Sequence, residues 1–151
     1  MDAWLVLRGL RTLSVRVQQQ CASALQIATF LDEHAHVIKV HYPGLGSHTN
    51  HDVAQVQMNG KFGGVLSFEL ASEPMAMAVV GAVQIFQRAT SLGGTESLIE
   101  HRASIEPEER RVSAPGLLRL SVGLEDTDDL IRDLQQAIAI AVQVVGDEAS
   151  A

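Results

Sequence analysis

Arg119 is one side chain in this sequence that could bind a small charged ligand. It lies in Leu117-Leu118-Arg119-Leu120-Ser121-Val122, the clearest strand pattern of the chain. A guanidinium group can hold a carboxylate through two parallel hydrogen bonds, which orient the ligand as well as neutralise it. The position fits an exposed strand arginine equally well, because isolated charged side chains mostly lie on the surface. The residues alone leave both interpretations open.

A second candidate is the run Thr90-Ser91-Leu92-Gly93-Gly94. Glycine lets the backbone approach a ligand closely and adopt positive φ, and the serine adds a hydroxyl. A serine followed shortly by two glycines is, however, more often an ordinary turn.

A metal site is a weaker candidate. His34 and His36, and His48 and His51, form two close pairs. Metal sites need three or four converging ligands and a second shell of hydrogen bonds. The chain has one cysteine and no HExxH motif, so we expect no metal. That cysteine, Cys21, lies on an apolar helical face and is more typical of a small core residue than of a nucleophile.

Charge and composition exclude several classes of function. The formal net charge is -7, and Lys39 and Lys61 are the only lysines. Nucleic-acid binding requires clustered cations, so we expect no such partner. The single cysteine cannot form an internal disulfide and fits a reducing cytoplasm. No run approaches the roughly 20 apolar residues of a membrane span.

The patterns predict alternating helices and strands. Val17, Cys21, Leu25, Ala28 and Leu31 recur at helical spacing and should line one buried face. Helices are expected over 13–34, 51–58, 73–86 and after the acidic run 125–129; strands over 37–42, 65–70 and 117–122; a short apolar turn over 4–10; and an irregular stretch over 88–110. This order favours an α+β fold, with a small, mostly antiparallel sheet and helices packed on one face.

Five runs resemble one enzyme family, in its order and at about its spacing. They are DAWLVLRGLRTL (2–13), YPGLGSH (42–48), FGGVLSF (62–68), SLGGTESLIEH (91–101) and RLSVGLED (119–126). The family is the pyridoxal-phosphate (PLP) enzymes of Cys/Met metabolism, in the group of cystathionine gamma-synthase, cystathionine gamma-lyase and methionine gamma-lyase.

The resemblance implies a C-terminal small domain over 1–146, with 1–34 as a connecting helical segment and 147–151 as a frayed tail. PLP would be held by a large domain that has no counterpart here, and neither Lys39 nor Lys61 matches its Schiff-base lysine. We therefore expect no catalytic, cofactor-binding or metal-binding residue in this chain, and no PLP bound to it alone.

The resemblance also implies a substrate-binding set. Arg119 would hold the α-carboxylate of an amino-acid substrate, with help from Ser91. Thr90 occupies a position that differs between members, and Leu92 completes the set. Residues 101–110 are shorter than the corresponding segment of many members, so a wall of the substrate pocket differs.

The expected function is a part of elimination or replacement at the β or γ carbon of sulfur amino acids or activated homoserine. The expected partners are the large domain, the substrate carboxylate and a second copy of the chain. One alternative is a non-enzymatic dimerising or regulatory module that uses an exposed apolar patch at Trp4, Leu5, Val6 and Leu7. Another is a complete small enzyme that uses Lys39 or Lys61.

Overall fold

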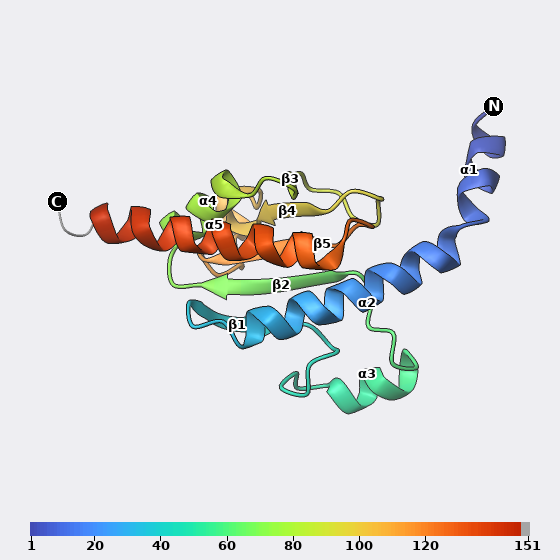
Figure 1. Ribbon diagram of the computed structural model, residues 1–151, viewed down its shortest axis with the longest axis horizontal. Helices are drawn as coiled ribbons and strands as arrows, with labels where there is room; N and C mark the ends of the chain where they lie inside the picture. Colours follow the sequence, from blue (N-terminus) through green and yellow to red (C-terminus); the bar gives the residue numbers. More distant parts are fainter. Residues whose placement is uncertain (149–151) are drawn as a thin grey trace.

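Three helices pack against one face of a five-stranded sheet in the computed structural model, which describes residues 1–148 (Figure 1). The helices of the described chain are α1 Asp2–Leu10, α2 Leu13–Asp32, α3 His51–Gln57, α4 Glu73–Ala82 and α5 Thr127–Glu148. The three that pack against the sheet are α2, α4 and α5. The strands are β1 Val37–His41, β2 Val65–Leu70, β3 Gln87–Arg88, β4 Leu98–His101 and β5 Leu117–Ser121, with two 3-10 turns, η1 Arg102–Ser104 and η2 Glu108–Arg110.

The strand order is β1-β2-β5-β4-β3. Neighbouring strands are antiparallel except β3 and β4, which pair in parallel at one edge. The α+β class and the mostly antiparallel sheet expected from the sequence are confirmed. Among the described residues, no helix is both long enough and apolar enough to cross a membrane.

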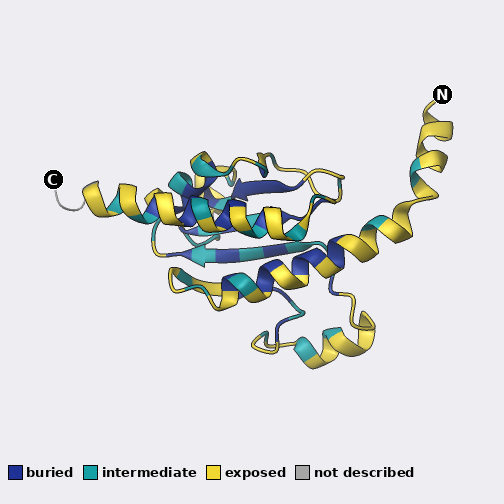
Figure 2. Cartoon of the chain, viewed as in Figure 1, coloured by how far each residue is buried: buried dark blue, intermediate teal, exposed yellow. Residues whose placement is uncertain are grey.

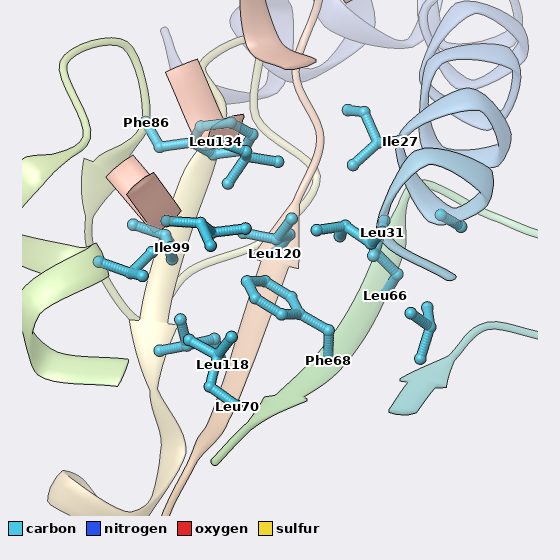
Figure 3. Close-up of a cluster of buried hydrophobic side chains, with 14 of the residues drawn as sticks. Ile27, Leu31, Leu66, Phe68, Leu70, Phe86, Ile99, Leu118, Leu120 and Leu134 are labelled. Atoms are coloured by element: carbon cyan, nitrogen blue, oxygen red, sulfur yellow. The ribbon is translucent and has the colours of Figure 1, made fainter. Parts of the chain in front are cut away.

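The hydrophobic core lies between the sheet and helices α2, α4 and α5 (Figure 3). Side chains alternate across a strand, so every second residue of the central strands faces these helices. The buried strand residues of this cluster include Leu66, Phe68, Leu70, Ile99, Leu118 and Leu120. Ile27 and Leu31 of α2 and Leu134 of α5 meet them from the helical layer.

The opposite face of the sheet carries polar side chains. Arg119 pairs with Ser67 on β2 and with Glu100 on β4, so these three residues form a row across the sheet. Because strand neighbours in register point to the same side, the row lies on the face away from the helices.

The buried face of α2 differs from the one expected. Cys21, Ala28 and Leu31 are buried, but Val17 and Leu25 are 40% and 38% exposed. Leu25 lies about 60° around the helix from Ala28 and about 120° from Leu31, at the outer side of the buried stripe. Val17 belongs to the half of α2 that extends beyond the sheet (Figure 1). Helical spacing located the stripe, but it could not show where the sheet ends.

Residues 2–10 form helix α1 instead of the short apolar turn that we expected. Its leucines, alanine and arginine are good helix formers, and no proline interrupts them. None of its residues is buried, and Figure 2 shows it almost entirely exposed at the end of α2. Trp4, Leu5, Val6 and Leu7 are each more than half exposed.

Helix α4 ends at Ala82, four residues before the expected end at Phe86. The carboxylate of Asp133 on α5 accepts the backbone N–H groups of Gln84, Ile85 and Phe86 at 2.8, 2.8 and 3.1 Å. This buried acceptor takes the N–H groups that a longer helix would use internally, so the chain leaves α4 and enters β3.

The stretch 88–110 is more regular than expected, since it contains β4 and both 3-10 turns. All four residues of β4 are buried, so the strand lacks the alternation that marks a half-exposed strand. Helix α5 also runs through Asp147 to Glu148, where we expected a frayed tail. The rest of that tail, 149–151, lies outside the described residues.

Candidate functional site

Arg119 is held on the polar face of the sheet by three acceptors. Its Nε lies 2.7 Å from Oε1 of Glu100. One terminal nitrogen, Nη2, donates to the carbonyl oxygens of Thr90 at 2.8 Å and Ser91 at 3.4 Å. The described residues include no partner for the other, Nη1. A guanidinium fixed in this way has a donor nitrogen available for an anion.

Glu100 lies at the centre of this arrangement. Its side chain is only 3% exposed, and Oε1 also accepts a hydrogen bond from Nη1 of Arg102 at 2.9 Å. The hydrogen bond to Glu100 raises the pKa of Arg102, so Arg102 stays charged. The other carboxylate oxygen of Glu100, Oε2, is buried without a hydrogen-bond partner among the described residues.

Several distant elements fix the loop 89–97 beside Arg119. Gly93 donates its N–H to the hydroxyl of Ser121 on β5 at 3.0 Å. Gln20 of α2 donates from Nε2 to the carbonyl oxygen of Gly94 at 2.7 Å. Gly93 has a φ of +78°, a left-handed conformation that favours glycine at this turn. The glycine at position 93 therefore has a structural reason, whatever part the loop takes in binding.

The far end of the same loop is held by Glu125. Its Oε1 accepts the N–H of Ser97 at 2.8 Å, and its Oε2 accepts the Ser97 hydroxyl at 2.7 Å. Leu124 in turn donates its N–H to the carbonyl oxygen of Thr95 at 2.8 Å. The loop is thus tied along its length to the segment that links β5 and α5.

The structure brings three of the four expected site residues together. Arg119 contacts the backbone of Thr90 and Ser91, while Leu92 projects from the same loop and is 59% exposed. A role for these residues in substrate binding stays a prediction. A cleft of about 240 Å³ borders the group, lined by Arg88, Ala89, Thr90, Glu100, His101 and Ile105.

Sequence reasoning missed Glu100, Arg102 and Gln20 as parts of this arrangement. A Glu directly after the apolar pair Leu98-Ile99 gave one signal, because a charged residue in a buried strand must find a partner. Nothing in the sequence joined it to Arg119, 19 positions further along the chain. Gln20 is buried in α2, although glutamine side chains are mostly exposed.

The segment after η1 is braced by Glu106. Its carboxylate accepts the hydroxyl and N–H of Ser113 at 2.6 and 3.1 Å and the N–H of Val112 at 3.0 Å. These hydrogen bonds, led by the Ser113 hydroxyl, lower the pKa of Glu106 to about 2. Glu106 also lies 3.5 Å from Arg102, which connects this brace to the arginine site.

In the described part of the chain, the remaining candidate groups make no hydrogen bond or ion pair with Arg119. His34 and His36 have their ring centres 5.8 Å apart, and His51 contacts the carbonyl oxygen of Pro43 through Nδ1. Among the described residues, no three His, Cys, Asp or Glu side chains converge as metal ligands would. Cys21 is buried in α2.

Lys39 and Lys61 do not fit a PLP site. Both lysines are exposed, on β1 and in the turn after α3. A Schiff-base lysine must be desolvated or otherwise activated beside the cofactor, and neither side chain has such surroundings here.

A family model of Cys/Met metabolism PLP-dependent enzymes matches residues 1–139. The chain belongs to this family. Among curated members, it is 45% identical over 144 residues to a cystathionine beta-lyase of Lactococcus lactis, which covers 91% of the chain and 38% of that enzyme. It is also 45% identical over 145 residues to the L-methionine gamma-lyase of Pseudomonas putida, covering 91% of the chain and 36% of the enzyme.

Solved structures of the family have the same fold. The cystathionine gamma synthase of Xanthomonas oryzae, in complex with aminoacrylate and cysteine, superposes with a TM-score of 0.88 at 43% identity. The match covers 94% of this chain and 38% of that one. The chain therefore spans less than two fifths of the length of these family members.

Proposed function

We propose that this chain is the C-terminal, substrate-carboxylate-binding domain of a PLP-dependent transsulfuration enzyme. The observation that carries the proposal is the setting of Arg119. Glu100 holds its Nε and the Thr90 carbonyl holds Nη2, while the described residues leave Nη1 without a partner. A fixed guanidinium with an available donor suits the α-carboxylate of an amino acid. Ser91 and Leu92 would line the same site, with Thr90 beside them.

The proposed domain covers residues 1–146, with 1–34 as the segment that connects it to a PLP-binding large domain. Family membership and the exposed positions of both lysines support a division of labour between two domains. The large domain would supply PLP, which acts as an electron sink for reactions at the β or γ carbon of sulfur amino acids or activated homoserine. The chain's own part would be to bind and orient the substrate.

The assembly would be a cytoplasmic homo-oligomer in which α1 packs against other protein. The exposed apolar side chains of this helix support that contact, since monomeric proteins rarely expose such groups side by side. The same observation favours a second candidate function, a non-enzymatic dimerising or regulatory module. The two candidates differ in whether Arg119 matters.

The test is reconstitution with the PLP-binding part of a relative, followed by release of keto acid from sulfur amino acids and O-acylhomoserines. We expect Arg119→Ala to lower kcat/KM by about 100-fold or more, because truncating one partner of a hydrogen-bonded charge pair is costly. Arg132→Ala is the control, since Arg132 is exposed and pairs only with Asp129 among the described residues. Full activity in Arg119→Ala would rule out the proposed carboxylate site.

A further inference from the structure

Among the residues that the structure describes, Glu100 is the one carboxylate that contacts the guanidinium of Arg119. It places both of its arginine contacts on the same oxygen, 2.7 Å from Arg119 Nε and 2.9 Å from Arg102 Nη1. Oε2 is buried and accepts nothing from the described residues. Buried polar atoms are nearly always hydrogen-bonded, so an unpaired one calls for an explanation.

We propose that Glu100 is a positioning residue that fixes the guanidinium of Arg119 so that Nη1 is directed to the substrate carboxylate. This inference rests on the proposed function. The Nε contact decides the orientation of the guanidinium plane, because Nε is the one donor attached next to the aliphatic chain. With Nε on Glu100 and Nη2 on Thr90, rotation of the plane would break both contacts.

Arg102 helps to hold Glu100 in place. It approaches Oε1 from η1 and is itself 30% exposed, so it lies between Glu100 and solvent. Its contact holds the carboxylate in place and offsets its charge. Pre-ordering a long, flexible side chain before a ligand arrives removes an entropic cost from binding.

The charge of Glu100 and its positioning of Arg119 should have opposite effects on anion binding, so substitutions of Glu100 can tell them apart. Removing the negative charge of Glu100 should strengthen the attraction of Arg119 for any anion. Weaker anion binding after that change can therefore only come from lost positioning. Glu100→Met keeps the length of the side chain but removes both acceptor oxygens, whereas Glu100→Gln removes the charge and retains an oxygen for Nε–H.

The experiment is an NMR titration of the full chain with acetate, followed at Arg119 Nε–H and at the amides of 90–92. We expect Glu100→Met to speed exchange of Arg119 Nε–H and to raise the Kd for acetate about fivefold, the order expected for re-ordering one long side chain. Glu100→Gln should keep slow exchange and bind acetate at least as tightly as the wild type. Glu69→Gln is the control, because Glu69 pairs with His41 on β1.

The outcomes separate this inference from the proposed function. Without saturable acetate binding at Arg119, or with binding that survives Arg119→Ala, the proposed function fails. If Arg119→Ala abolishes binding but Glu100→Met binds as tightly as the wild type, only the positioning role fails. In an Arg119→Ala background, Glu100→Met should change nothing further. If Glu100→Met does not fold, the wild-type chain decides: fast exchange of Arg119 Nε–H before acetate is added would mean that Glu100 does not hold the guanidinium, and would contradict the proposal.

Discussion

Three carboxylates fix irregular segments of this molecule by accepting several N–H or O–H groups at once. Asp133 holds the residues after α4, Glu125 holds Ser97, and Glu106 holds Val112 and Ser113. Each replaces hydrogen bonds that a regular element would supply to the backbone. Charge-assisted hydrogen bonds are stronger than neutral ones, so few such residues can order long loops.

Glu106 should stabilise the folded chain near neutral pH and lose this effect in acid. Its pKa falls from 4.5 to about 2 in the folded chain, because Ser113 and Val112 donate hydrogen bonds to the ionised form. The stabilisation is fully present above pH 4.5 and is lost as the pH falls through 2. We expect Glu106→Gln to lower the Tm at pH 6 and to have little effect near pH 2. A Tm difference that does not change with pH would contradict this assignment.

Among the secondary-structure elements, β5 and the start of α5 support the loop 89–97. Gly123, just after β5, lies so close to the loop that an added Cβ would be 2.4 Å from the Thr95 carbonyl oxygen and 2.6 Å from the carbonyl carbon of Glu96. No side chain fits there unless the loop moves. The site loop is therefore placed by the backbone of the neighbouring segment as well as by side chains.

Gly123→Ala should push this loop away from Arg119. We expect the free energy of unfolding to fall by about 1–3 kcal/mol, as for other overpacked sites, and acetate binding at Arg119 to weaken. Gly81→Ala in α4 is the matched control, since an added Cβ there meets nothing within 4 Å and alanine favours a helix. Denaturant unfolding and the acetate titration measure both effects. Equal stability of the two variants would contradict the close approach.

The sequence predicted the regular elements well where one face is polar. The strands at 65–70 and 117–122 alternate, and their bounds agree with β2 and β5 to within a residue. Strand β4 was missed because both of its faces are buried, and the end of α4 was missed because Asp133 lies 49 positions from Gln84. The residues alone left the role of Arg119 open, and the family resemblance favoured a substrate site. Glu100 required the register of β4 against β5.

The whole molecule is asymmetric, with a packed body and an unsupported N-terminal end. Helix α1 has no buried residue, whereas the C-terminal half of α2 packs into the core (Figure 2). The hydrogen bond from Arg16 to the Gly9 carbonyl oxygen, at 3.0 Å, is one of the few contacts that tie α1 to α2. The packed core and the exposed apolar side chains of α1 thus lie in different parts of the chain.

Removal of residues 2–10 should decrease self-association and leave the stability of the fold nearly unchanged. Because α1 buries nothing, we expect the free energy of unfolding to change by less than about 0.5 kcal/mol. Self-association, measured by sedimentation at high concentration, should decrease because the exposed apolar groups are gone. The paired control is Val112→Ser, which removes a highly exposed apolar side chain far along the chain from α1. A wild-type chain that is monomeric at high concentration would contradict the expected self-association.

The two faces of the sheet also have a consequence for how such a protein can evolve. Leu118 and Leu120 face the helices, while Arg119 between them faces the other way, so the same short strand serves the core and the candidate site. Substitutions at exposed loop positions such as Thr90 and Leu92 leave the apolar layer untouched. Ligand preference can therefore drift at those positions under weak selection for stability, whereas Glu100, which is buried, should tolerate far fewer replacements.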